Sequence, residues 1–399
     1  MSVEFLRRDV FKKRHQKIRS FLDEENYEAY LVLTADNFYY VSGFFLDVQP
    51  WERPVAACIP KEGEPFLVLN ELSTNHVEMA QNRGSLAIDD IHFWREHPSS
   101  TDRNYTRLQW NQLLASQLRD RGIERGAVVC DADPSSVEGI TARIPKLEIR
   151  KESEILKQLR LVKSSEELQY IREGAKLTDY GQSVWKELVD AGELVSAVDA
   201  EATKQMLLKG ADMFPGSKLE CRVFSLSGPA SASPHGTGGD SDMTFEEGHG
   251  VVNIIIVRLN GYVTENERTW FLGEPSTRQI DAFEAAAEAT RAATEQMIEG
   301  NRVSSIDAAA QGVIEDAGFG DKICHRTGHG IGIAGHEYPD DVAFNHRPLM
   351  ANEVWSAEPG IYIYGLGGFR HDDTVIVGKE ESEVVTKWSL ELEEQTIPV

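Results

Sequence analysis

Three segments in the later part of the chain gather the side chains that could do chemistry. They cover residues 253–269, 325–332 and 356–374. In the first, Glu265 and Glu267 lie two positions apart on a predicted strand, so both side chains point to the same face. If that face lines a pocket, two carboxylates converge there and can hold a cation, transfer a proton or attack an electrophilic carbon. The other two segments add His325, His329, Glu358 and Asp372.

Further histidines lie in glycine-rich surroundings. His235 belongs to the sequence SASPHGTGGD, which predicts a loop, and histidine is the side chain best suited to proton transfer near neutral pH. His325 and His329 are four residues apart in HRTGHGIG, but the three glycines of that segment favour a turn or strand end over a helix. His336 follows in AGHEYP and is expected to line the same pocket.

The overall composition excludes several classes of function. A net charge of −24 argues against nucleic acid and anionic membranes as partners. No run of about 18 apolar residues is present, and the basic, amphipathic N-terminus does not read as a signal peptide. The four cysteines are widely spaced, which fits a reducing compartment. We therefore expect a cytoplasmic enzyme.

The 399 residues are long enough for two domains. Residues 1–152 alternate helical and strand-like stretches, an α/β pattern whose strands include 29–33, 55–59, 65–69 and 127–130, while 92–104 read as a loop. Residues 153–399 open with a capping box, Ser164 followed by Glu167, at the start of a helix. Helices at about 278–297 and 306–317 and strands at 251–257, 261–271, 353–356 and 374–377 then predict an α+β domain.

The three segments together resemble the creatinase/prolidase/methionine-aminopeptidase family, the "pita-bread" enzymes. The resemblance covers nearly the whole chain and implies a smaller α/β N-terminal domain before a pita-bread α+β catalytic domain. The metal-dependent members hold two divalent ions with an Asp, a second Asp, a His, a Glu and a final Glu. Carried over by motif, these positions are Asn253, Glu265, His329, Glu358 and Asp372.

Two of these positions depart from the family pattern. The amide of Asn253 carries no charge and cannot replace a carboxylate that bridges two cations. Asp372 is one methylene shorter than the family's Glu. For the next residue, Asp373, the alternative is a structural role, an ion pair with Arg268 or Arg370. The resemblance thus implies a pocket without metal or other cofactor, in which Asn253, His329 and Asp372 contact the substrate.

The same resemblance implies roles for other residues. His235 matches the family's PHG loop, whose His shuttles protons, and His325 and His336 match substrate-contacting positions. Glu267 has a counterpart in creatinase, whereas Glu265 has none and points to a different substrate. Trp51 and Arg53 follow YYVSG, where creatinase carries an aromatic residue and an Arg that reach the partner subunit's site and bind the substrate carboxylate. A homodimer with shared sites is therefore implied.

Within the family, the altered ligand set resembles the metal-independent, creatinase-like branch and is most similar to ectoine hydrolases. This implies opening of the cyclic amidine of ectoine, or of a similar zwitterionic amidine, to N-acetyl-2,4-diaminobutyrate. Glu265, Glu267 and Glu358 would surround the amidinium. His235 would assist water, or Glu265 would attack directly.

Other functions stay open. A metal-dependent prolidase or Xaa-Pro aminopeptidase could hold one ion through Glu265, His329, Glu358 and Asp372. A creatinase-type enzyme acting on another guanidine or amidine, an osmolyte lyase and a catalytically inactive binding protein are further alternatives.

Overall fold

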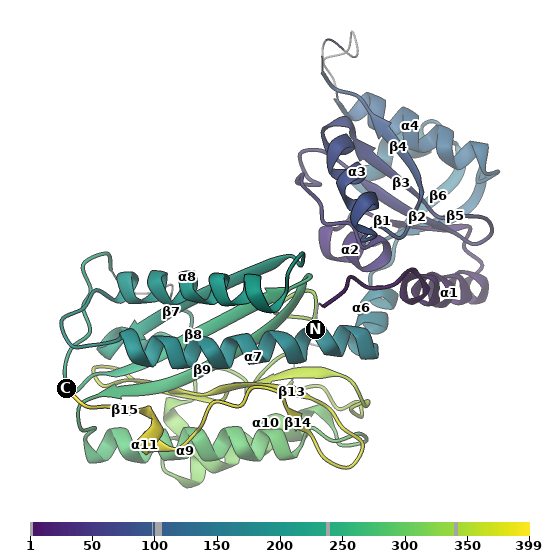
Figure 1. Ribbon diagram of the computed structural model, residues 1–399. Coiled ribbons are helices and arrows are strands. Elements are labelled where there is room, and N and C mark those ends of the chain that lie inside the picture. Colours follow the sequence, from purple (N-terminus) through teal and green to yellow (C-terminus); the bar gives the residue numbers. More distant parts are fainter. Residues whose placement is uncertain (1–2, 98, 100–105, 237–239, 339–341) are drawn as a thin grey trace. The chain divides into compact units, whose positions relative to one another are not determined.

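The computed structural model describes residues 3–97, 99, 106–236, 240–338 and 342–399. The chain forms two compact units, one covering Phe5–Arg160 and the other Leu161–Val399 together with the start of the chain. Figure 1 shows the ribbon of both units. No helix in the described residues is long and apolar enough to cross a membrane.

The first unit is an α/β domain, as predicted. Its described residues form a six-stranded mixed sheet in the order β4-β3-β2-β1-β5-β6. The strands are β1 (Ala29–Val32), β2 (Ala56–Pro60), β3 (Phe66–Asn70), β4 (Asp90–Trp94), β5 (Arg125–Cys130) and β6 (Lys146–Lys151). The helices are α1 (Arg8–Glu25), α2 (Ala35–Ser42), α3 (Thr74–Arg83), α4 (Thr106–Asp120), α5 (Glu138–Thr141) and α6 (Glu154–Leu161). The predicted loop at 92–104 is wrong at its start, because His92, Phe93 and Trp94 pair with β3; most of its later residues lie outside the described residues.

The second unit has the α+β architecture that the family resemblance implies, built on an antiparallel sheet. Its main path runs β10-β13-β9-β8-β7, with a separate β11–β12 hairpin. The strands are β7 (Leu219–Ser227), β8 (Gly250–Leu259), β9 (Tyr262–Leu272), β10 (Val354–Ala357), β11 (Gly360–Ile363), β12 (Gly367–Arg370), β13 (Asp372–Ile376), β14 (Glu383–Val384) and β15 (Thr396–Ile397). The helices are α7 (Ser165–Leu188), α8 (Val195–Met213), α9 (Thr277–Glu295), α10 (Val303–Asp316) and α11 (Leu392–Gln395). Short 3₁₀ segments are η1 (Glu71–Ser73) and η2 (Pro134–Val137) in the first unit, and η3 (Gly228–Ala232) and η4 (Gly320–Lys322) in the second.

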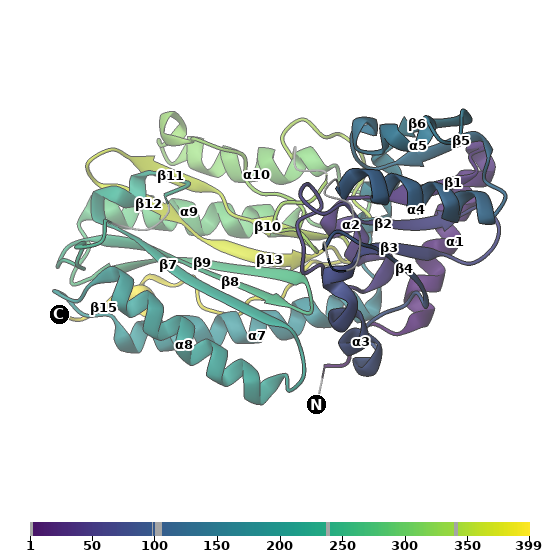
Figure 2. The ribbon, with the colours of Figure 1, turned by 90° about the horizontal axis from the view of Figure 1, so that it is seen from above.

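Helices cover one face of this sheet. Helix α7 packs on β8 and β9, α8 packs on β7, and α9 packs on β10 and β13, an arrangement that Figure 2 shows from above. The predicted capping box is confirmed, since the Ser164 side chain accepts from the Glu167 backbone N–H and starts α7. A Cβ at Gly181 would lie 2.6 Å from the sulfur of Met206 and 2.9 Å from Ile255, so glycine allows α7 to approach the sheet. The opposite face of β7–β9 is left for a site.

Candidate active site

The β8–β9 hairpin determines which side chains face the site. Its turn, Asn260–Gly261, has φ angles of 46° and 89°, the left-handed pair that a tight two-residue hairpin needs. The strands then pair without interruption, with Ile254 opposite Glu267 and Ile256 opposite Glu265. These four side chains therefore share the face that points away from α7.

This face opens into a cavity of about 250 Å³. Its walls come from β7, β8 and β9, from the loop before β8, from the segment between α10 and β10, and from the β10–β13 region. The lining residues are Arg222, Phe224, Pro234, His235, Gly236, Ile254, Ile256, Glu265, Glu267, His329, His336, Glu358 and Arg370. The structure thus brings together His235, Glu265, Glu267, Glu358, His329 and His336 from distant parts of the chain.

The carboxylates are buried close to one another, which disfavours their charged forms. Burial, reinforced by the charges of Glu358 and Glu267, raises the pKa of Glu265 well above its usual range. Burial also raises the pKa of Glu267, although Arg370 opposes this shift. Asp372 lies beneath them, and its pKa is raised well above the usual range by burial and by the neighbouring acids. Such a cluster favours a cation or a shared proton.

Arg370 is the cation that the chain itself supplies to the cluster. Its guanidinium forms an ion pair with Glu267, and its Nη2 lies 3.1 Å from Glu267 Oε1. Its Nη1 donates to the carbonyl oxygen of Pro234 at 2.9 Å and lies 3.3 Å from the Tyr362 hydroxyl. Arg370 therefore connects the acid cluster to the loop that carries His235.

Two imidazole rings stack at the cavity wall. His329, only 2% exposed, lies parallel to His336 with the ring centroids 3.6 Å apart. The His329 Nε2 atom is 3.5 Å from Glu265 Oε2 and 3.4 Å from Glu358 Oε1. His329 thus lies between a carboxylate from β9 and one from the turn that joins β10 to β11.

The structure places Asn253 away from the cavity, which argues against the prediction that it contacts the substrate. Side chains alternate along β8, so Asn253 faces the helices, where its Nδ2 donates to Ser225 Oγ at 3.2 Å. The residue of β8 that stands opposite Glu267 in the cavity is Ile254. Counting back from the Asn260–Gly261 turn would have given this register. The position on β8 where the family's first metal ligand would face the cavity is therefore occupied by an apolar side chain, Ile254.

His325 and Asp372 lie behind the cavity wall. The Nε2 atom of His325 is 2.7 Å from the Tyr362 hydroxyl, and burial lowers the pKa of His325 to about 4. Asp372 accepts a hydrogen bond of 3.0 Å from Ser356 Oγ. Among the described residues neither side chain lines the cavity, although the Asp372 carboxylate lies beside those of Glu267 and Glu358.

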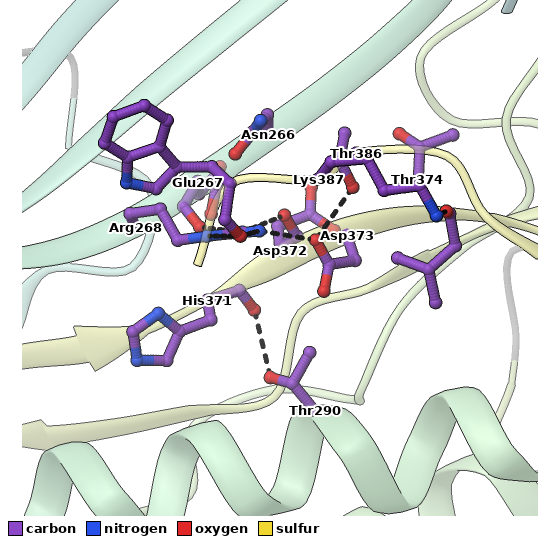
Figure 3. A network of polar contacts seen from close by, with 12 residues as sticks. Asn266, Glu267, Arg268, Thr290, His371, Asp372, Asp373, Thr374, Thr386 and Lys387 are labelled. Atoms are coloured by element: carbon purple, nitrogen blue, oxygen red, sulfur yellow. Dashed lines mark hydrogen bonds and ion pairs between the residues drawn. The ribbon is translucent and has the colours of Figure 1, made fainter. Parts of the chain in front are cut away.

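The ion pair proposed for Asp373 is confirmed for Arg268, at 2.7 Å between Nη2 and Oδ1 (Figure 3). Arg268 also donates to the backbone carbonyls of Glu267 and Asp372, at 2.7 and 2.9 Å. Thr386 donates a further 2.7 Å hydrogen bond to Asp373. This network fixes β9 against β13 and so holds Glu267 beside Asp372.

Trp51 and Arg53 belong to the first unit. Trp51 is 77% exposed, and Arg53 forms ion pairs with Glu52 at 2.7 Å and Glu96 at 2.8 Å. Their predicted reach into a partner's site stays a prediction.

The acid cluster fits one divalent ion. Glu267, Glu358 and Asp372 each offer a carboxylate oxygen, and these oxygens lie within 4.8 Å of one another. Asp372 Oδ2 is buried without a hydrogen-bond partner among the described residues, as an oxygen awaiting a cation would be. A second ion does not fit equally well, because Ile254 offers it no ligand.

Several cavity residues were not predicted from the sequence. Arg222 and Phe224 come from β7, and Ile254 and Ile256 come from β8. The alternation of side chains along β7 and β8 was the signal in the sequence that could have identified these four residues. Using it requires knowing which residues of the two strands pair.

Comparison with known proteins agrees with this architecture. Residues 169–379 match the model of metallopeptidase family M24, and residues 14–162 match that of the creatinase/prolidase N-terminal domain. The chain therefore belongs to the M24 family and has its two-domain, pita-bread architecture. It is 30% identical over 382 residues to a putative dipeptidase, YkvY, of Bacillus subtilis, covering 95% of this chain and 99% of the relative.

Further relatives carry peptidase names. An Xaa-Pro dipeptidase of Pyrococcus horikoshii is 26% identical over 389 residues, covering 96% of this chain and 99% of the relative. Among solved structures, dipeptidase PepE of Mycobacterium ulcerans superimposes with a TM-score of 0.81 at 27% identity, covering 99% of this chain and 100% of that one. The Xaa-Pro dipeptidase of Bacillus anthracis gives 0.81 at 25%, covering 98% and 100%. These similarities favour the peptidase alternative over the ectoine hydrolase prediction.

Proposed function

We propose that this cavity hydrolyses a C–N bond of a small zwitterionic substrate and that the substrate is an Xaa-Pro dipeptide. The observation that carries the proposal is the convergence of Glu265, Glu267, Glu358 and His329 in one cavity, in a chain whose relatives along nearly their whole length include Xaa-Pro dipeptidases. The family assignment supports a hydrolase, and the names of the relatives support the peptide bond.

The chain's own residues can perform most of the reaction. Glu265, whose pKa is raised by burial and by the neighbouring acids, lies in the cavity where it can give a proton to the departing nitrogen. His235, on the loop that Arg370 holds, can exchange protons with solvent. Ile254 and Ile256 offer an apolar floor for a proline ring. A divalent ion held by Glu267, Glu358 and Asp372, when bound, would polarise the carbonyl and lower the pKa of an attacking water.

A second candidate is the metal-free opening of a cyclic amidine such as ectoine. It is favoured by Ile254, which offers no metal ligand on β8. It is also favoured because Glu265, Glu267 and Glu358 outnumber the two arginines among the described residues that line the cavity. An amidinium would relieve the repulsion within that cluster. Water would add to the ring carbon with help from His235, and one ring C–N bond would break to leave N-acetyl-2,4-diaminobutyrate.

One experiment separates the two candidates. Purified protein is assayed with Ala-Pro, ectoine and creatine side by side, before and after exhaustive chelation, and its metal content is measured. Turnover of Ala-Pro that is lost on chelation and restored by one metal equivalent supports the peptidase. Turnover of ectoine that survives chelation supports the amidine hydrolase and contradicts the first proposal. Turnover of none of them contradicts both.

We also propose a cytoplasmic homodimer in which Trp51 and Arg53 close the partner's cavity. The proposal is supported by the aromatic–Arg pair after YYVSG and by the exposure of Trp51.

A further inference from the structure

Strand β7 contributes a cation to the cavity that the proposed reaction does not use. Arg222 and Phe224 are two residues apart on this strand and pair with Ile256 and Ile254 on β8. Because side chains alternate along a strand, both project on the same face as those isoleucines, into the cavity. Their neighbours Val223 and Ser225 face α8 instead, where Thr203 and Asp199 hold them.

The guanidinium of Arg222 is positioned but unneutralised. Its carbon lies 4.2 Å from the centroid of the Phe224 ring, a cation–π contact that holds the long side chain over the cavity. Among the described residues it forms no hydrogen bond or ion pair, and it is exposed. The other arginine that lines the described part of the cavity, Arg370, is ion-paired with Glu267. Arg222 is therefore the guanidinium available to a ligand.

The charges of the cavity are arranged along one direction. Strands β7, β8 and β9 are consecutive neighbours in the sheet, and adjacent strands lie roughly 4.8 Å apart. The acids Glu265 and Glu267 are on β9, apolar Ile254 and Ile256 are on β8, and the cation Arg222 is on β7. A ligand that crosses these strands meets negative, apolar and positive surface in turn.

We propose that Arg222 binds the carboxylate of the substrate and so sets its orientation in the cavity. The inference rests on the proposed function only in taking the ligand to be a small carboxylate. A planar guanidinium can donate two parallel hydrogen bonds to a carboxylate. For an Xaa-Pro dipeptide, the ring then lies on Ile254 and Ile256 and the scissile bond lies at the acids. Arg222 is thus a specificity-determining residue, distinct from the acids that carry the reaction.

The test compares an acid with its amide. Initial rates are measured for Ala-Pro and for Ala-Pro amide, which lacks the carboxylate, with wild type, Arg222→Met and Arg222→Lys. Loss of a charge-assisted hydrogen bond should raise KM for Ala-Pro by on the order of ten-fold or more, with a smaller effect on kcat. The KM for the amide should not change, and Arg222→Lys should recover part of the loss. Arg172→Met, which removes an arginine paired with Glu383 on the surface, is the matched control for net charge.

A binding measurement keeps the test independent of turnover. Calorimetric titration with L-proline and with L-prolinamide uses the same variants and needs no reaction. Binding of L-proline to the wild type that is lost in Arg222→Met, but kept in Arg172→Met, supports the inference even if no dipeptide is hydrolysed. Equal binding of L-proline to wild type and Arg222→Met, or no binding to either, overturns it. An equal rise in KM for acid and amide would also overturn it.

Discussion

Ile254 limits how many metal ions the cavity can hold. It stands opposite Glu267, at the position on β8 where a carboxylate would face the acids of β9 and β13. An isoleucine there supplies no oxygen to a cation, and the described residues then offer one cluster of three carboxylates, Glu267, Glu358 and Asp372. At the scale of single residues, Ile254 is therefore the side chain that we expect to decide between one bound metal ion and two.

We therefore expect Ile254→Asp to add metal capacity. Bound manganese or zinc should rise from at most one ion per chain in the wild type towards two in the variant, because the new carboxylate can share a second cation with the acid cluster. Elemental analysis after dialysis against each metal measures this directly. Ile254→Val is the control for the change in packing. Two ions per chain in the wild type would refute this view of Ile254.

Glu265 is the acid on which both candidate reactions depend. Glu265→Gln keeps the shape of the side chain and removes its ability to exchange a proton or carry charge. Loss of a general acid or base typically lowers turnover by roughly 100-fold or more. The measurement is kcat with Ala-Pro and with ectoine, together with a thermal melt to show that the fold survives. A folded variant with normal turnover of both would remove Glu265 from the reaction.

At the scale of secondary structure elements, Asp199 joins α8 to β7, the strand that carries Arg222 and Phe224. Its carboxylate accepts hydrogen bonds from the Ser225 backbone N–H at 2.8 Å, from Ser225 Oγ at 2.7 Å and from Trp185 Nε1 at 3.2 Å. Burial nevertheless outweighs these bonds and raises the pKa of Asp199 to about 6. The folded state therefore favours the protonated form of Asp199 more than the unfolded chain does.

This shift predicts a dependence of stability on pH. Because the folded pKa lies above the unfolded one, the stabilising contribution is full below the unfolded pKa of 3.8 and is lost as pH rises through about 6. The loss should be about 3 kcal/mol across that window. Urea unfolding at several pH values should show a smaller fall in stability between pH 4.5 and 7.5 for Asp199→Asn than for the wild type. Parallel curves would show that Asp199 does not titrate in this range.

At the scale of the whole molecule, the homodimer predicts a role for the first unit. Sedimentation should show a dimer, and Arg53→Ala should raise KM for Ala-Pro by on the order of ten-fold if its guanidinium reaches a partner-bound substrate. Arg53 already pairs with Glu52 and Glu96, whereas Arg222 has no such partner among the described residues. The comparison of acid and amide, repeated with Arg53→Ala, shows which arginine recognises the carboxylate. A monomer with full activity would contradict the shared site.

The sequence by itself determined several of the elements and the family. The Ser164–Glu167 capping box predicted the start of α7, and the predicted strands 251–257 and 261–271 correspond to β8 and β9. These signals are local, so they survive without knowledge of the rest of the chain. The short motifs around His235, Glu265, His329 and Glu358 likewise identified side chains that the fold brings together.

Only the tertiary structure decided which side chains face the cavity. Side chains on a strand alternate between its two faces, and the position assigned from the motif was one residue away from the observed one. Asn253 therefore faces the helices, and Ile254 faces the acids. The ion pair of Arg370 with Glu267 joins residues 103 apart in the chain, and Arg222 meets the other cavity residues only through the pairing of β7 with β8. Such contacts depend on packing across the sheet, which no local pattern of residues records.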